Sequence, residues 1–167
     1  MPDFKTAIIG AGFMGSTHTE ALRRLAIPVS GICGVDIAES RSAAQKLHLG
    51  EGYGCFEDAL ADPAVNVVHL CTPNHLHYPM AKAALKAGKH VLCEKPLAND
   101  SREAAELVAL EKGTGRVGGL NYNLRFYPLN QEARARIHSG EVGDVRIIHG
   151  EYCQDWLFLA SDWNWRL

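Results

Sequence analysis

The sequence has neither the long apolar run nor the excess of basic charge that mark several large classes of protein. No apolar run approaches the roughly 20 residues that cross a bilayer. The opening residues MPDFKTAIIG lead directly into a strand-like run, so we expect no signal peptide. The formal net charge of −2 offers nothing to attract nucleic acid or an anionic membrane. We therefore expect a cytoplasmic protein with neither a membrane nor a nucleic acid as its partner.

Paired cysteines are also missing. The five cysteines stand at positions 33, 55, 71, 93 and 153, an odd number without a C-x-x-C pair. Cys33, Cys71 and Cys93 lie in or at the ends of apolar runs, where a thiol behaves as a small buried hydrophobe. This pattern argues against a disulfide framework or a zinc site, and we expect reduced thiols and no metal.

Short apolar runs alternate with segments of helical period as far as residue 122. We expect strands at 5–10, 29–36, 51–53, 64–71, 90–94 and 116–122. Helices are expected at 13–25, 39–47, 57–61, 77–87 and 101–112. Nearly unbroken apolar strands separated by helices predict an α/β fold, a doubly wound parallel sheet with helices on both faces.

The segment GAGFMG, residues 10–15, matches the pattern G-x-G-x-x-G between the first strand and the first helix. Gly10 would form the tight turn, Gly12 would let a pyrophosphate approach the backbone, and Gly15 would let helix and strand pack closely. The N–H groups that open the helix would face the pyrophosphate. A packing turn without a ligand is the alternative.

Asp36 ends the second expected strand. A carboxylate there accepts hydrogen bonds from an adenosine ribose and repels a 2′-phosphate, which favours NAD over NADP. Arg41 could soften that preference if its side chain reached back, although a cation on a helix surface is the simpler interpretation.

Two further segments follow buried strands at the same edge of the sheet. In CTPNHLHYP, residues 71–79, Thr72 and Asn74 supply polar groups at a helix start; His77 is expected beside the cofactor or as a plain cap, not as a metal ligand. In CEKP, residues 93–96, burial at the mouth of a site could fit Lys95 for acid or base chemistry with Glu94 orienting it. A solvated Glu–Lys pair is the alternative.

The regular alternation of expected strands and helices ends after Tyr122. A basic-faced helix is expected at 129–138 and a long strand at 145–156. A single strand leaves its edges unpaired, so we expect residues 123–167 to be the start of a second domain that follows a first domain of residues 1–122.

These blocks occur in one order: GAGFMG, CTPNHLH, AGKHVLCEKPLA, LNYNLRFYP, GEVGDV and DWNWR. Together they resemble the Gfo/Idh/MocA family of nicotinamide-dependent sugar and polyol oxidoreductases, from Ala7 to the last residue. The resemblance implies a Rossmann domain followed by an α/β domain with a large open sheet. It also implies that Lys95 assists proton transfer at the substrate carbon.

The resemblance extends the expected cofactor site to Asn123 and Arg125 after the sixth strand and to Trp165 and Arg166 near the nicotinamide. The residues expected to contact the dinucleotide are Gly10, Gly12, Phe13, Met14, Gly15, Asp36, Cys71, Thr72, Pro73, Asn74, His77, Glu94, Lys95, Pro96, Asn123, Arg125, Trp165 and Arg166.

One element of the family pattern, a D-x-x-x-H segment with the catalytic histidine, does not follow in this sequence. We expect an N-terminal portion of a dehydrogenase that acts on a sugar-like hydroxyl or carbonyl carbon, able to bind NAD but with little turnover, and assembled as a homo-oligomer. The alternative is a non-catalytic dinucleotide-binding module that self-associates through an exposed strand at 145–153.

Overall fold

The computed structural model describes residues 4–163. Two compact units make up the chain, residues 1–121 and residues 122–167, and each is described here by itself. None of the helices in the described part has both the length and the apolar character needed to cross a bilayer.

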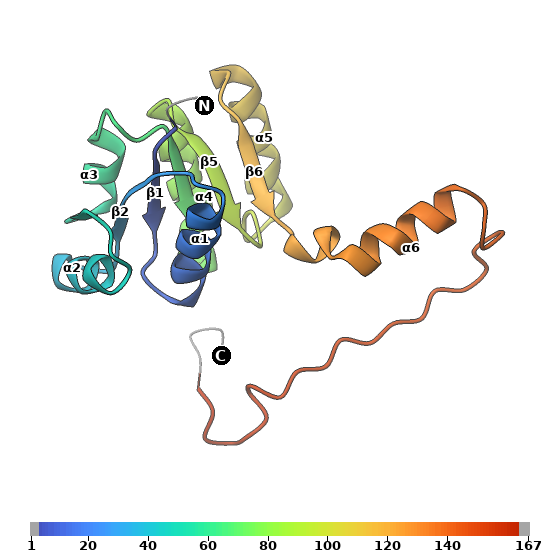
Figure 1. Ribbon diagram of the computed structural model, residues 1–167. Coiled ribbons are helices and arrows are strands. Elements are labelled where there is room, and N and C mark those ends of the chain that lie inside the picture. The colour runs from blue at the N-terminus through green and yellow to red at the C-terminus, as the bar shows by residue number, and fades with distance from the viewer. Residues whose placement is uncertain (1–3, 164–167) are drawn as a thin grey trace. The chain divides into compact units, whose positions relative to one another are not determined.

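The first unit is built on a six-stranded parallel sheet (Figure 1). Its strands are β1 (Thr6–Ile9), β2 (Val29–Cys33), β3 (Glu51–Gly52), β4 (Val67–Leu70), β5 (His90–Glu94) and β6 (Gly118–Asn121). They lie in the order β3-β2-β1-β4-β5-β6, and every neighbouring pair is parallel. This is the strand order of the dinucleotide-binding doubly wound fold, so the predicted fold class is confirmed.

Five helices connect these strands. They are α1 (Phe13–Arg24), α2 (Ile37–Lys46), α3 (Phe56–Ala61), α4 (Asn74–Lys86) and α5 (Ser101–Thr114). Each lies at an expected place, with one notable shift: α4 begins three residues before the expected start at residue 77. Pro73 stands at its N-cap with φ −59°, and because proline already has a helix-compatible φ, the helix can start directly after it.

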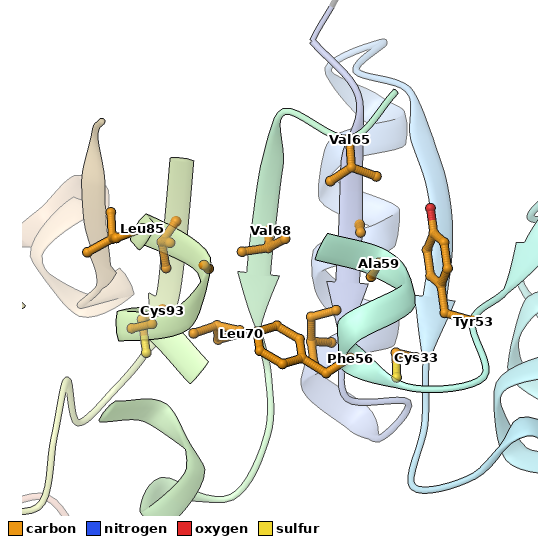
Figure 2. Packing of buried hydrophobic residues seen from close by; sticks show 14 of the residues in the cluster. Cys33, Tyr53, Phe56, Ala59, Val65, Val68, Leu70, Leu85 and Cys93 are labelled. Carbon is orange, nitrogen blue, oxygen red and sulfur yellow. The ribbon is translucent and has the colours of Figure 1, made fainter. Parts of the chain in front are cut away.

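Side chains of the sheet alternate between two apolar layers. Ile8 and Ile32 pack with Leu22 of α1 and with alanines of α2 on one face. Ala7, Ile9, Val68 and Leu70 belong to the larger cluster on the other face, together with residues of α3, α4 and α5. Figure 2 shows this second layer, with Phe56 and Ala59 of α3 and Leu85 of α4 against the strands. The central strands are therefore covered on both faces, which explains their nearly unbroken apolar sequences.

The second unit contains a 3₁₀ helix, η1 (Asn123–Phe126), and a helix, α6 (Pro128–His138). The helix expected at 129–138 is confirmed. The strand expected at 145–156 is wrong, because these residues form neither strand nor helix. A strand needs a neighbour to pair its backbone N–H and C=O groups, and no described segment lies beside these residues as a ladder partner.

Candidate functional site

The loops after β1, β2, β4 and β5 meet at one edge of the sheet, because the strands are parallel and in register. Ile9 pairs with both Cys33 and Leu70, and Leu70 pairs with Cys93. The chain order reverses between β1 and β4, where β1 has β2 on one side and β4 on the other. Ligands of such sheets bind outside the carboxyl ends of the strands at this reversal. The sequence-predicted segments 10–15, 71–74 and 94–96 all begin there.

Two of the three glycines in GAGFMG are required by packing. Gly10 has a φ of +111°, and a Cβ atom on it would lie 2.4 Å from the carbonyl oxygen of Cys71. A Cβ atom on Gly15 would lie 1.9 Å from the carbonyl oxygen of Gly10. Both contacts are with backbone atoms, which cannot move away cheaply. The absence of a side chain at these two positions therefore allows β1, α1 and the loop after β4 to pack closely.

Gly12 differs from the other two. A Cβ atom on Gly12 would meet no atom of the described residues within 4 Å. Gly12 is the N-cap of α1 and supplies no side chain to cap the first turn. The first N–H groups of α1 receive no side-chain cap from Gly12 and can bind an outside acceptor. Phe13, the first residue of the helix, is 82% exposed, while Met14 is half-buried.

Asp36 follows β2 at the same edge and is exposed. Its Oδ1 accepts a hydrogen bond of 2.8 Å from the backbone N–H of Glu39, so the side chain caps α2. This cap fixes the carboxylate in place. The second oxygen, Oδ2, accepts no hydrogen bond from any residue in the described range, so it can accept one from a ligand hydroxyl.

The loop after β4 holds a buried hydroxyl that has no partner. Thr72 Oγ1 is buried and makes no hydrogen bond within residues 4–163. A hydroxyl buried in this way is costly unless something else satisfies it. Next to it, burial raises the pKa of the Cys71 thiol, which keeps the thiol protonated.

His77 joins two of the loops. Its Nε2 lies 2.8 Å from the carbonyl oxygen of Thr72, and its Nδ1 lies 2.6 Å from that of Pro96. The residue is 1% exposed. Its ring therefore connects the loop after β4 to the turn after β5, and both ring nitrogens are occupied.

The turn after β5 presents Lys95 to solvent. Lys95 is exposed, and its peptide bond to Pro96 is cis. Glu94, by contrast, is 6% exposed, and its Oε2 accepts a hydrogen bond of 3.2 Å from the backbone N–H of Lys95. The solvated Glu–Lys ion pair considered above is absent, since no ion pair between these two side chains occurs in the described structure.

Glu94 belongs to a polar cluster that the sequence analysis missed. His18 of α1 and His69 of β4 are both buried and lie with Asn121 at the end of β6 around this carboxylate. One signal was available: His18 stands three residues after Gly15, on the side of α1 that faces the sheet. No group of three or more His, Cys, Asp or Glu side chains in the described range is arranged to hold a metal ion.

Four of the expected residues lie outside the described part of the first unit. Asn123 and Arg125 lie in η1 of the second unit, and both are exposed. Trp165 and Arg166 lie outside the described residues. The contribution of these four stays a prediction.

Three of the remaining residues offer groups that a dinucleotide can use. Gly12 leaves room at the start of α1, where N–H groups can bind a pyrophosphate. Asp36 offers a carboxylate oxygen to a ribose, and Thr72 offers a buried hydroxyl that lacks a partner. All three lie at the reversal point of the sheet, where this fold binds such ligands.

Comparisons with known proteins agree with this geometry. The model of an oxidoreductase family with an NAD-binding Rossmann fold matches residues 4–122. Levoglucosan dehydrogenase of Pseudarthrobacter phenanthrenivorans is 32% identical over 169 residues, which cover 93% of this chain and 42% of that protein. Inositol 2-dehydrogenase of Corynebacterium glutamicum is 32% identical over 149 residues, covering 87% of this chain and 44% of that protein.

A solved structure of levoglucosan dehydrogenase in complex with NADH and levoglucosan superposes with a TM-score of 0.79 at 31% identity, over 84% of this chain and 40% of that one. The chain thus spans about two fifths of the length of these relatives. Because the family model matches residues 4–122, the chain belongs to the Gfo/Idh/MocA family of oxidoreductases with an NAD-binding Rossmann fold.

Proposed function

We propose that the first unit binds NAD(H) across the carboxyl edge of its sheet and that the protein is a dehydrogenase of a sugar-like or polyol substrate. The observation that carries the proposal is the contrast among the three glycines. Packing explains Gly10 and Gly15, whereas no residue of the described range 4–163 occupies the space beside Gly12. A ligand that approaches the backbone at the start of α1 accounts for a glycine there.

Each residue has a distinct part in binding. The N–H groups that follow Gly12 receive the pyrophosphate, helped by the positive end of the α1 dipole. The Asp36 carboxylate accepts hydrogen bonds from the ribose hydroxyls. Its negative charge repels a 2′-phosphate, so NAD is preferred to NADP. Thr72 donates its buried hydroxyl to the cofactor, and His77 keeps the loops on either side of the nicotinamide end at a fixed spacing.

Lys95 is the proposed proton-transfer residue. When bound, the nicotinamide supplies the hydride chemistry. An exposed ammonium on a turn fixed at its backbone can donate a proton to a carbonyl oxygen or, once neutral, take one from a hydroxyl. The named activities of the relatives, on levoglucosan and inositol, support a substrate rich in hydroxyl groups.

Cofactor binding is tested by titrating the chain with NADH and following the protein-dependent change in nicotinamide fluorescence. Saturable binding that NAD displaces is expected. Absence of saturation at millimolar NADH would refute the proposal.

The dehydrogenase step is tested separately with NAD and levoglucosan or inositol. Any NADH that forms should depend on Lys95, so Lys95→Ala should abolish it while saturable NADH binding is retained, weakened at most by the loss of one contact.

We also propose that the protein forms a homo-oligomer through residues of the second unit. In the segment expected to be a strand, Ile147 and Ile148 are 85% and 89% exposed, and Tyr152 is 75% exposed. Neighbouring apolar side chains exposed to this degree favour association. Native mass spectrometry should detect an oligomer that the double substitution Ile147→Asp, Ile148→Asp converts to monomer. A wild-type monomer at high concentration would rule the proposal out.

A further inference from the structure

Four polar side chains from four elements form a cluster inside the first unit, directly behind the turn that carries Lys95. His18 lies in the middle of α1, His69 in β4, Glu94 at the end of β5 and Asn121 at the end of β6. His18, His69 and Glu94 are between 6% and 8% exposed, and Asn121 is half-buried. A cluster of this kind is costly to bury unless its members satisfy one another.

The contacts converge on one carboxylate oxygen. Glu94 Oε1 lies 3.0 Å from His18 Nε2 and accepts a hydrogen bond of 2.5 Å from Asn121 Nδ2. A carboxylate only accepts hydrogen bonds, so we assign to His18 Nε2 a proton that it donates to Glu94. Asn121 Nδ2 lies 3.2 Å from the same ring nitrogen, and in this assignment it donates to the carboxylate and not to the ring. The other nitrogen of that ring, Nδ1, lies 3.0 Å from His69 Nδ1.

His69 holds the ring of His18 from behind. The two rings meet edge to face, with centroids 5.1 Å apart. Burial, followed by the nearby His18, lowers the pKa of His69 to about 4, so His69 is neutral at neutral pH. With one ring nitrogen on His69 and the other on Glu94, His18 has a fixed orientation.

The second carboxylate oxygen of Glu94 contacts the backbone of Lys95. Oε2 accepts a hydrogen bond of 3.2 Å from the backbone N–H of Lys95. His18 and Asn121 both contact Oε1, which restrains rotation of the carboxylate and favours the orientation in which Oε2 faces this N–H group. A chain of contacts therefore runs from the middle of α1 to the backbone of the turn that presents Lys95.

We propose that His18 is a positioning residue for Lys95, acting through the carboxylate of Glu94. The consequence for catalysis rests on the proposed role of Lys95 in proton transfer. The structural part of the proposal, that His18 determines whether the Lys95 N–H is held, does not depend on a bound cofactor. His18→Leu removes one of the two donors to Glu94 Oε1 and leaves Asn121 alone there, which loosens the carboxylate that faces the Lys95 N–H. His18→Gln keeps an N–H donor on a side chain of similar reach.

The experiment measures hydrogen exchange of the Lys95 amide by NMR on the cofactor-free chain. In His18→Leu this amide should exchange about tenfold faster, since a hydrogen bond to a charged group is lost. The matched control is the amide of Val91, in the same strand, which donates to the carbonyl oxygen of Val117 over 3.0 Å. It should change much less. His18→Gln should restore most of the protection at Lys95.

A merely structural role for His18 would speed exchange at Val91 and Lys95 in parallel, and that result would overturn the proposal. Unchanged protection of Lys95 in His18→Leu would overturn it as well. A second measurement uses the wild-type protein alone. The ¹⁵N chemical shifts of the His18 ring should show a proton on Nε2. A ring protonated on Nδ1 alone would contradict the proposal. NADH titration is run separately, so failure to bind NADH counts against the proposed function and not against this inference.

Discussion

Gly15 and Gly10 touch so closely that a single methyl group cannot be placed between them. A Cβ atom on Gly15 would lie 1.9 Å from the carbonyl oxygen of Gly10. Gly15 is in the first turn of α1, and Gly10 follows β1, so this contact sets the distance between the helix and the strand. Gly12 lies between them in the sequence but has open space beside its Cα.

These neighbours give a matched pair of substitutions. Gly15→Ala should lower the free energy of unfolding by about 1–3 kcal/mol, because the added methyl forces α1 away from β1. Gly12→Ala should cost at most about 1 kcal/mol, the effect of a poorer N-cap, and yet should weaken NADH binding by roughly tenfold or more. Urea unfolding and NADH titration measure the two effects. Equal NADH affinity in Gly12→Ala and wild type would mean that no ligand approaches there.

Asp36 allows its charge to be separated from its role as a helix cap. Asn caps a helix about as well as Asp, so Asp36→Asn should keep α2 intact. Loss of the negative charge should raise NADPH affinity about fivefold, corresponding to about 1 kcal/mol of relieved repulsion at an exposed site. Asp100 caps α5 with the same 2.8 Å bond, to the N–H of Glu103. Asp100→Asn is therefore the control, and a similar gain in NADPH affinity there would contradict a role for Asp36.

His69 should make the stability of the first unit depend on pH. Its pKa in the folded protein is about 4, against an ordinary value of 6.5, because burial and His18 disfavour the charged ring. The unfolded chain thus binds the proton more readily, and stability is complete above about pH 6.5 and is lost as the pH falls toward 4. The loss is at most on the order of 3 kcal/mol.

Urea unfolding at several pH values checks this dependence. His69→Asn keeps a hydrogen-bonding group near the position of Nδ1 but cannot titrate, so it should flatten the slope between pH 4 and 6.5. The same substitution at the exposed His75 is the control and should leave the slope in place. A slope that survives in His69→Asn would assign the pH dependence to another group.

The sheet and its carboxyl edge could be predicted because their signals are local. The run at 90–94 is apolar, lies between a helix closed by glycine and a capped helix, and forms β5 with the expected bounds. The parallel arrangement then follows from the alternation of strands and helices, and it brings the loops after β1 and β4 to one edge. No information about distant contacts is needed for these steps.

The polar cluster could not be predicted in the same way, because it depends on contacts between distant parts of the chain. His18 is 51 residues from His69 and 76 residues from Glu94 in the sequence. Each of these residues alone is typical of a helix face or a strand end. The strand expected at 145–156 was predicted wrongly for a related reason: alternating side chains indicate a strand, but a strand forms only where a second segment pairs with it.

Thr72 provides a test in which stability and binding should respond differently. Valine has the shape of threonine without the hydroxyl, and Thr72 Oγ1 is buried without a partner in the described structure. Thr72→Val should therefore leave the free energy of unfolding unchanged or raise it slightly, since a buried hydroxyl is removed that nothing satisfied. NADH binding should weaken by about 2- to 10-fold, the effect of one lost hydrogen bond.

The control is the same substitution at Thr19, whose buried Oγ1 donates to the carbonyl oxygen of Gly15 over 2.8 Å. Thr19→Val should instead lower the free energy of unfolding. A loss of stability in Thr72→Val as large as in Thr19→Val would show that the Thr72 hydroxyl already has a partner inside the protein and is not held for the cofactor.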